Sequence, residues 1–585
     1  MTRIRVWAPN AESVRLVTPD RQSVMEQTTH GWWESSEELA PDSRYRFAVG
    51  DVVLPDPRSP RQPEGPEGWS QTVDHTAFEW HDADWTGFPL ASAVVYELHV
   101  GTFSPDGTFA GVLGRLDELV DLGVSAVEIM PVATFAGTRG WGYDGVNLFA
   151  PHESYGGPDG LRRLVDACHD RQLAVILDVV YNHLGPVGNS LGRFGPYFTD
   201  TYHSPWGDAV NLDGAGSDEV RRFIIDNALQ WIVDYHVDGL RLDAVHALHD
   251  ESAVHILDEL GEEVHAAGRR LGRVVWVIAE SDLNDPRLVR SNEAYGYGLD
   301  AAWSDDFHHA LHVSLTGERD GYYGDFDGID DLAEAINNVY VFSGRFAPSR
   351  ERSHGLGVGE MDRSRFVCFA QNHDQIGNRA TGERLAHLIS TERAEIAAAL
   401  LLTTPFVPML FQGEEWAASA PFQYFTDIED EEVGSAVREG RRGEFASFGW
   451  KPEDVPDPQD PATFRRSRLD WSERDHSEHA RILQWHTQLI ALRAEHPSLR
   501  DGRISGTVVH HQPGTHVLVI ERNELTVVVN LGDSTETIEV RPIETVLLTN
   551  DDSVMGVGDS GTAVGDSGTI TLRADRVAIL EHHIE

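Results

Sequence analysis

The sequence feature that most constrains the fold is a series of eight short apolar runs between residues 93 and 411. Most of them are separated by stretches with helical periodicity, at residues 111–122, 160–171, 218–235 and 252–270. Buried strands that alternate with helices are typical of a parallel sheet, and eight of them predict an α/β protein built on a closed (β/α)8 TIM barrel. The runs span residues 93–100, 125–130, 174–180, 239–243, 274–280, 299–304, 366–371 and 408–411.

Both flanks of this region have a different pattern. Residues 1–50 alternate apolar and polar side chains in short bursts, which predicts a small N-terminal β-sandwich of immunoglobulin-like type, and a proline-rich linker follows at 55–68. After about residue 500, six short runs predict a C-terminal antiparallel β domain. A Gly-rich duplication there, at 557–562 and 564–569, indicates a tolerated surface insertion. We therefore predict three domains, at residues 1–88, 89–495 and 496–585.

The charge balance excludes two classes of partner. With 47 basic and 95 acidic residues the formal net charge is −48, which repels phosphate backbones and argues against nucleic acid and anionic membrane as partners. Residues 1–6 lack the apolar run of a signal peptide, and no apolar stretch of about 18 residues occurs, which predicts a cytoplasmic location. The acidic residues are dispersed along the chain, which predicts adaptation to a salt-rich cytoplasm.

Ionisable residues gather where the predicted strands end. In a barrel of this type the catalytic groups lie at the carboxyl ends of the strands, so these residues are expected to converge. A carboxylate at the end of an apolar strand is costly to bury without partners, and several converging carboxylates are harder to explain as packing than one. The segments concerned are DVVYNH (178–183), GLRLD (239–243), AE (279–280) and QNHD (371–374).

Paired carboxylates on adjacent strands predict glycoside hydrolysis. One carboxylate attacks the anomeric carbon while a carboxylic acid protonates the leaving oxygen, and a separation of about 5–5.5 Å is the retaining geometry. The nearby Arg241 is expected to keep Asp243 ionised by charge pairing. Glu280 follows a run of apolar residues, which favours a raised pKa and an acid role.

The same four segments resemble, in order and in spacing, the conserved regions of the α-amylase superfamily of glycoside hydrolases. Longer segments are similar to one family within it, the malto-oligosyltrehalose trehalohydrolases. The resemblance implies an enzyme that cleaves the α-1,4 bond next to the terminal trehalose unit of malto-oligosyltrehalose and releases trehalose. These longer segments lie at residues 184–200, 202–214, 281–287, 301–326, 371–379 and 421–427.

The resemblance also implies roles for individual residues. Asp243 would be the nucleophile, Glu280 the general acid/base and Asp374 the third carboxylate, which stabilises the transition state. Aromatic residues near strand ends either stack on sugar rings or pack between loops, and both readings stay open here. The expected substrate-binding residues are Tyr143, Asp144, Asp178, His183, Arg241, His373, Asp305, Asp306, His308, Trp206, Trp416 and Phe425. One departure from many relatives is Ile428, which stands where histidine is expected after Asp427.

Two other functions are compatible with parts of this pattern. A glycogen branching or debranching enzyme would share the sandwich and the barrel, and a non-catalytic glycan-binding protein would be expected to lack one of the three carboxylates. His308, His309 and His312 are close in sequence, but no acidic ligand is placed to complete a zinc site with them, so we expect no metal and no cofactor. The resemblance implies malto-oligosyltrehalose synthase as a functional partner, and the sequence leaves physical association open.

Overall fold

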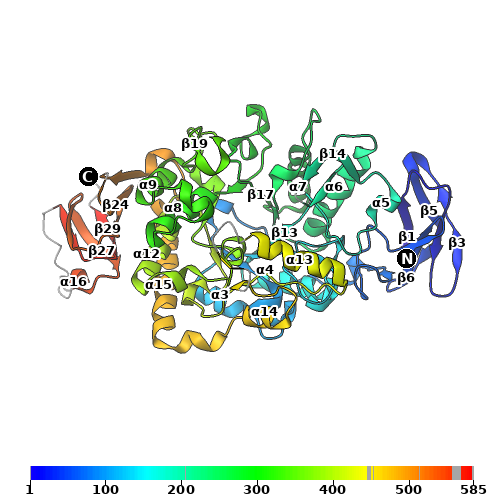
Figure 1. Ribbon diagram of the computed structural model, residues 1–585, viewed down its shortest axis with the longest axis horizontal. Coiled ribbons are helices and arrows are strands. Elements are labelled where there is room, and N and C mark those ends of the chain that lie inside the picture. The colour runs from blue at the N-terminus through cyan, green and yellow to red at the C-terminus, as the bar shows by residue number, and fades with distance from the viewer. Residues whose placement is uncertain are drawn as a thin grey trace.

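Eight parallel strands close into a barrel near the middle of the molecule, which confirms the eight strands predicted from the apolar runs (Figure 1). A computed structural model of the chain describes residues 2–204, 206–444, 450–451, 454–512, 514–555 and 568–582. The barrel strands follow one another in sequence order, and the last pairs with the first. They are β9 (Val95–Leu98), β10 (Ala126–Ile129), β13 (Ala174–Val179), β16 (Gly239–Leu242), β17 (Trp276–Ala279), β18 (Ala301–Trp303), β21 (Phe366–Phe369) and β22 (Val407–Phe411).

Every residue of these strands is buried, since alternate side chains face the barrel interior and the others face the surrounding helices. Three predicted helices are confirmed as α4 (Gly157–Asp170), α6 (Ser217–Asp234) and α7 (Ile256–Leu271). The helix predicted at 111–122 is instead two helices, α2 (Phe109–Leu113) and α3 (Leu116–Leu122). The helix breaks there because Gly114 ends α2 and Arg115 leaves helical geometry, with φ −123° and ψ 5°.

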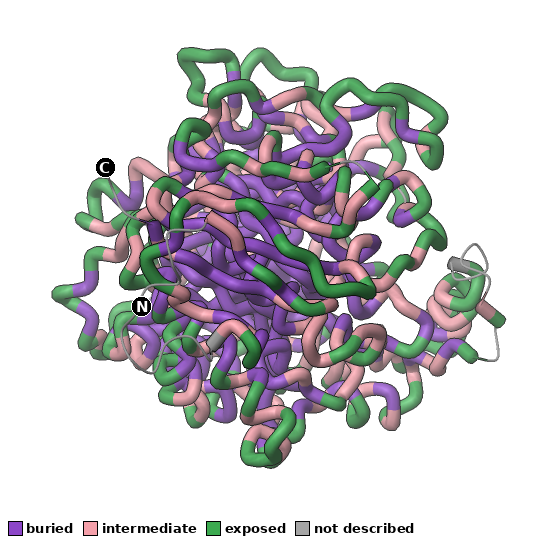
Figure 2. Tube along the Cα trace, turned by 90° about the vertical axis from the view of Figure 1, so that its left-hand side faces the viewer, coloured by how far each residue is buried: buried purple, intermediate pink, exposed green. Residues whose placement is uncertain are grey.

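The barrel interior is filled with side chains and closed at its N-terminal end. Large apolar residues from the strands, Trp276 among them, pack with Trp85 from the segment that leads into β9. Phe88 from the same segment contacts Trp276 at 5.4 Å between ring centroids. Figure 2 shows this buried interior in purple inside a more exposed shell. The barrel is therefore a packed core, and its chemistry belongs at the other end.

A buried polar cluster ties this segment to the base of the barrel. The His169 ring lies between two carboxylates, 2.8 Å from Asp82 and 2.9 Å from Asp238, and it stacks on Trp85. The indole nitrogen of Trp85 donates to Asp238 at 2.7 Å. Arg273 also reaches Asp82, at 2.8 Å. Each buried charge of the cluster thus has a partner of opposite sign, as burial requires.

Two antiparallel sheets form the N-terminal region, on the right of Figure 1. One has the order β1-β5-β4 and the other β3-β2-β6-β7, with β8 paired to β6. Trp7 packs on Tyr197 and Phe47 on Phe194, which joins these sheets to the loop after β13. The strands are β1 (Thr2–Trp7), β2 (Val14–Val17), β3 (Gln22–Val24), β4 (Glu26–Gln27), β5 (Trp32–Leu39), β6 (Arg44–Val49), β7 (Val52–Leu54) and β8 (Ser70–Gln71).

The C-terminal region holds a five-stranded antiparallel sheet of order β23-β24-β25-β29-β27 and a two-stranded sheet of β26 and β28. The six predicted strands are confirmed within these sheets. The duplicated segment falls mainly on residues 556–567, outside the described residues. The strands are β23 (Val508–His511), β24 (Val517–Arg522), β25 (Leu525–Asn530), β26 (Glu536–Glu539), β27 (Ile543–Thr549), β28 (Thr569–Leu572) and β29 (Arg576–His582).

The longest insertion lies between β18 and β21, as the spacing of the runs predicts. It contains α8 (Asp305–Thr316) and α9 (Ile329–Asn338). A second insertion follows β22 and contains α13 (Glu431–Glu444). Within the described part of the chain, no helix is long and apolar enough to cross a membrane.

Candidate active site

A cleft of about 690 Å³ opens at the carboxyl ends of the barrel strands. Asp243 follows β16, Glu280 follows β17, and Asp374 lies in α10 (His373–Gly377), the short helix after β21. All three carboxylates line this cleft. They are far apart in sequence, and the parallel order of the barrel strands brings them to one end of the fold.

Arg241, on β16, connects the acidic residues of the cleft floor. Its Nη1 atom donates to both oxygens of Asp178 and to Oδ1 of Asp243, each at 2.9 Å, and its Nη2 atom lies 3.1 Å from Oε2 of Glu280. Trp303 stacks against the guanidinium at 4.2 Å. Two of the candidate catalytic carboxylates therefore bind neighbouring nitrogens of one rigid, planar group, which fixes their relative position.

A second side chain orients Asp243. The amide nitrogen of Asn182 donates to Oδ2 of Asp243 at 2.7 Å and to its carbonyl oxygen at 2.7 Å. With Arg241 on the other oxygen, the carboxylate accepts hydrogen bonds on both sides, which fixes its orientation. Asn182 was not among the predicted site residues. Its position between Tyr181 and His183 after β13 is the sequence signal that points to it.

Glu280 has the environment of a general acid. Burial raises the pKa of its carboxyl group to about 7, with Arg241 opposing the rise and the charges of Asp243 and Asp374 adding to it. The backbone N–H of Ala244 donates to its Oε2 atom at 2.6 Å. Near neutral pH, Glu280 is therefore partly protonated, as the general acid of a two-carboxylate mechanism must be.

Asp374 is held in place by Asn378 and, through it, by Arg441. Asn378 donates to its Oδ1 atom at 2.6 Å, and Asn378 in turn accepts from Arg441 at 2.8 Å. Arg441 lies on α13, which borders the cleft with Val437 and Gly440. Neither Asn378 nor Arg441 was predicted, because Arg441 stands on a polar helix that carries no sequence sign of a site.

Tyr143 and His373 line the cleft and form one hydrogen-bonded set with the buried Asp178. The Tyr143 hydroxyl group lies 2.6 Å from Oδ2 of Asp178 and 2.7 Å from Nε2 of His373. The tyrosine and histidine rings are stacked, 5.1 Å apart. Gly142 allows this placement, since it adopts φ 103°, and a Cβ there would meet the carbonyl oxygen of Pro131 at 2.1 Å.

His183 and Trp206 form a second wall of the cleft. Their rings stack at 4.3 Å with an angle of 8° between the planes. Burial lowers the pKa of His183, which favours its neutral form. Trp206 is 51% exposed, so part of its ring face is open to a ligand. An exposed aromatic face beside the carboxylates suits stacking on a sugar ring.

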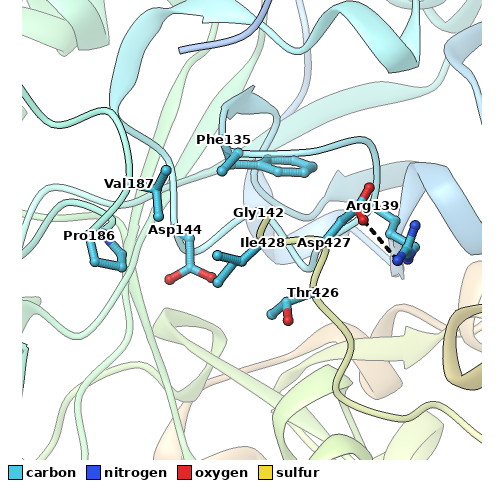
Figure 3. A pocket seen from close by; sticks show the side chains of 11 residues that line it. Phe135, Arg139, Gly142, Asp144, Pro186, Val187, Thr426, Asp427 and Ile428 are labelled. Atoms are coloured by element: carbon cyan, nitrogen blue, oxygen red, sulfur yellow. Dashed lines mark ion pairs between the residues drawn. The ribbon is translucent and has the colours of Figure 1, made fainter. Parts of the chain in front are cut away.

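Asp144 borders both the cleft and a small adjoining cavity of about 10 Å³. In Figure 3 the side chain of Ile428 points toward the Asp144 carboxyl group, with Pro186 and Val187 nearby. Burial raises the pKa of Asp144. The apolar Ile428 thus offers neither charge nor hydrogen bond to a carboxyl group that a histidine at this position could pair with.

The three residues predicted to bind substrate at the start of the long insertion, Asp305, Asp306 and His308, divide between two places. Asp305 lines the cleft, and burial raises the pKa of its carboxyl group well above the ordinary range, with a further contribution from Glu280 and Asp374. Asp306 is buried and does not belong to the described lining of the cleft. It accepts from the backbone N–H groups of Val341 and Phe342, which fixes the end of the insertion.

Three further predicted binding residues are also placed away from the cleft. His308 is buried, with Nδ1 at 2.7 Å from the carbonyl oxygen of Ala370 and Nε2 at 3.0 Å from the Tyr323 hydroxyl. Trp416 and Phe425 are fully buried, so neither can stack on sugar as predicted. Trp416 packs on Trp471, and Phe425 packs in an aromatic cluster. For these aromatics the packing alternative holds.

The histidines of α8 have protein partners as well. Nε2 of His312 lies 2.7 Å from Glu318, and burial lowers the pKa of His309 to about 3. Across the described residues, no group of three or more His, Cys, Asp and Glu side chains is arranged to hold a metal ion.

Comparison with known proteins finds a matching family model, related sequences and a similar solved structure. Residues 45–191 match the family model described as alpha amylase, catalytic domain. The malto-oligosyltrehalose trehalohydrolase of Arthrobacter ramosus is 52% identical, over 85% of this chain and 87% of that protein. The enzyme of the same name from Mycobacterium tuberculosis is 44% identical, over 98% and 99% of the two chains. A solved structure described as a putative alpha amylase from Salmonella typhimurium has a TM-score of 0.90 at 36% identity, and covers 99% of this chain and 97% of its own.

Proposed function

The chain belongs to the malto-oligosyltrehalose trehalohydrolase family of the α-amylase superfamily, and from this premise we propose that it hydrolyses the α-1,4 bond next to the terminal trehalose unit of malto-oligosyltrehalose. The observation that carries the proposal is the placement of Asp243 and Glu280 on one guanidinium, with Asp374 in the same cleft. Trehalose and a shortened malto-oligosaccharide are the products.

In the first step Asp243 attacks the anomeric carbon of the glucose unit that precedes trehalose. A bond forms between its carboxylate oxygen and that carbon, while the bond from the carbon to the leaving oxygen breaks. Glu280 gives its proton to the leaving oxygen, so trehalose departs as a neutral sugar. The raised pKa of Glu280, about 7, keeps this proton available near neutral pH.

In the second step water hydrolyses the glycosyl-enzyme. Glu280, now ionised, takes a proton from water, and the resulting oxygen bonds to the anomeric carbon as Asp243 leaves. Asp374 contributes hydrogen bonds to sugar hydroxyl groups that strengthen in the transition state. Each of the two displacements inverts the anomeric carbon, so its configuration is retained overall, and both carboxylates return to their starting protonation states.

Selectivity for trehalose must come from the leaving-group side of the cleft. Polar groups arranged for an α,α-1,1 linkage are left unpaired by a maltosyl end, at a cost of about 1–3 kcal/mol for each unsatisfied group. Asp305 of the long insertion and Tyr424 of the loop after β22 border the cleft, and we assign this role to them. They lie in two of the segments that resemble the trehalohydrolase family, 301–326 and 421–427.

Product analysis tests the proposal. In high KCl the enzyme is given malto-oligosyltrehalose and a malto-oligosaccharide of equal length. Rapid release of trehalose from the first with slow attack on the second is the expected result. Comparable cleavage of both, or formation of α-1,6 branches, would point to another α-amylase superfamily activity. Failure to cleave either would favour the glycan-binding alternative.

Four further points are part of the proposal. The enzyme works in a salt-rich cytoplasm, a reading that rests on the dispersed net charge of −48. Malto-oligosyltrehalose synthase supplies the substrate of this enzyme.

The chain divides into domains at residues 1–88, 89–495 and 496–585. It needs no metal or cofactor for turnover. Cell fractionation tests the location, and copurification tests the link to the synthase. Limited proteolysis tests the domain bounds, and an assay after chelation tests whether turnover needs a metal.

A further inference from the structure

Glu97 is a buried carboxylate beneath the cleft to which the two-step mechanism gives no role. It lies on β9 with its side chain inside the barrel, and it is 1% exposed. The described residues that border the cleft do not include it. A charge in this position needs a partner that compensates for the loss of water.

That partner is His373, which Glu97 contacts at two points. Oε2 of Glu97 accepts from the backbone N–H of His373 at 2.9 Å, and Oε1 contacts Nδ1 of the ring. One carboxylate thus fixes both the main chain and the ring of His373. A ring held at Nδ1 has a defined tautomer and a defined orientation of its other nitrogen.

The hydrogen bonds on the far side of the ring set the direction of the protons. The Tyr143 hydroxyl group has one proton, and at 2.6 Å it donates that proton to Asp178. Nε2 of His373, 2.7 Å from the same hydroxyl oxygen, must therefore be the donor to it. With Nδ1 donating to Glu97, the ring carries two protons and a positive charge.

The charges around the ring agree with this state. Burial alone would lower the pKa of His373, but the negative charge of Glu97 and its hydrogen bond outweigh burial and raise it. Asp374 acts in the same direction, and Arg241 acts against it. The geometry and the local charge both favour a doubly protonated imidazole next to the nucleophile's own partners.

We propose that Glu97 is a positioning residue that holds His373 as a doubly protonated, fixed donor on the cleft wall and thereby fixes the hydroxyl group of Tyr143. The hydrogen bonds run from Glu97 through His373, Tyr143, Asp178 and Arg241 to Asp243. Both His373 and Tyr143 border the cleft, so Glu97 acts on the sugar through them. The inference rests on the proposed function for its substrate.

The chain offers a matched control in Glu128. It lies on the neighbouring strand β10 in register with Glu97, and it is also 1% exposed. Both of its carboxylate oxygens lack a hydrogen-bond partner among the described residues. Burial raises the pKa of Glu128 well above its ordinary range, which favours the neutral form of this carboxyl group. Glu128→Gln therefore changes a glutamate of equal burial without touching the His373 ring.

The experiment measures kcat and KM for Glu97→Gln and Glu128→Gln over a range of pH on malto-oligosyltrehalose. Glu97→Gln is expected to lower kcat about 10- to 100-fold, because the His373 ring loses the carboxylate that orients it, with a smaller change in KM. In the wild-type enzyme Glu280 sets the alkaline limb of kcat/KM at about 7. Without the anion of Glu97 the pKa of His373 falls, so loss of the His373 proton should move this limb to lower pH. Glu128→Gln should keep kcat within about twofold of wild type and leave the pH profile in place.

A double-mutant cycle separates positioning from general damage. If Glu97 acts through His373, the double variant Glu97→Gln/His373→Gln loses no more kcat than His373→Gln alone. Additive losses, equal losses in both glutamate variants, or a normal Glu97→Gln enzyme would each overturn the proposal. Should Glu97→Gln fail to fold, Glu97→Asp enters the same cycle, where a partial loss that vanishes without His373 is expected.

The outcome can be told apart from failure of the proposed function. All variants are also assayed on a malto-oligosaccharide of equal length. If the wild-type enzyme cleaves this sugar and releases no trehalose from the other, the substrate assignment is wrong, and the Glu97 comparison is read on the sugar that is cleaved. A wild-type enzyme that cleaves neither would overturn both proposals.

Discussion

Glu280 and Arg241 meet at 3.1 Å, yet the pKa of Glu280 is raised to about 7, because burial outweighs the nearby positive charge. The proton that Glu280 keeps is the one the leaving oxygen needs. We expect kcat/KM to fall as pH rises through about 7, since the free enzyme then loses its general acid. A pH profile checks this, and a profile that stays flat to about pH 9 would contradict it.

The same shift predicts an effect on stability. Between the ordinary pKa of glutamate and about 7 the folded protein holds a proton that the unfolded chain has lost, so this group's contribution to stability falls as pH rises across that window. Glu280→Gln removes this cost. We expect the variant to be about 1–3 kcal/mol more stable than wild type at about pH 8, with less difference at about pH 4, while kcat falls about 10²- to 10⁴-fold. Denaturant unfolding at both pH values measures it.

Asp243→Asn tests the nucleophile. Asparagine keeps the size of the side chain and can still accept a hydrogen bond, so the fold should survive, while the attack on the anomeric carbon is lost. We expect kcat to fall by at least about 10⁴-fold with an unchanged circular dichroism spectrum. Asp178→Asn is the comparison, because Asp178 also binds Arg241 but does not attack the sugar. Near-wild-type turnover in Asp243→Asn would exclude its assigned role.

Trp206 and Trp416 should respond in opposite ways to substitution. Trp206 is 51% exposed beside His183, so Trp206→Ala is expected to raise KM roughly 3- to 10-fold with little loss of stability. Trp416 is fully buried, so Trp416→Ala should cost about 3–5 kcal/mol of unfolding free energy and leave KM unchanged in the folded fraction. Steady-state kinetics and thermal unfolding of both variants decide the matter. A KM effect confined to Trp416→Ala would reverse the assignment.

Ile428→His should lower the pKa of Asp144. The apolar Ile428 side chain points toward the Asp144 carboxyl group, whose pKa burial raises. A protonated histidine there would pair with the ionised carboxylate. The variant should therefore gain melting temperature over wild type at about pH 5.5 and lose the gain at about pH 8, where histidine is neutral. Ile428→Gln is the control, and a pH-independent difference in both variants would rule out an ion pair.

Salt should stabilise the whole chain. A net charge of −48 repels itself in dilute buffer, and at 1 M salt the Debye length is only about 3 Å. We expect the melting temperature to rise between low and multimolar KCl. An equal rise in a nonionic osmolyte would instead indicate a general solvent effect.

The local sequence pattern was enough to predict the barrel strands, whereas the placement of many site residues depends on long-range contacts. All eight strands could be predicted because buried parallel strands are short apolar runs, and the converging Asp243, Glu280 and Asp374 follow from where those runs end. Asn378 and Arg441 could not be predicted, since their role depends on how α13 folds over the cleft. Trp416 and Phe425 were misplaced for the same reason: an aromatic residue in a loop looks alike in sequence whether its ring meets sugar or another ring.

Trp85 and Phe88 close the N-terminal end of the barrel, so the active site is reached only from the opposite end. A sugar cannot thread through the barrel, so substrate, water and both products share the mouth at the carboxyl ends of the strands. The water of the second step has to approach the face of the sugar that trehalose has just left. Trehalose must therefore leave the cleft before water can release the shortened malto-oligosaccharide.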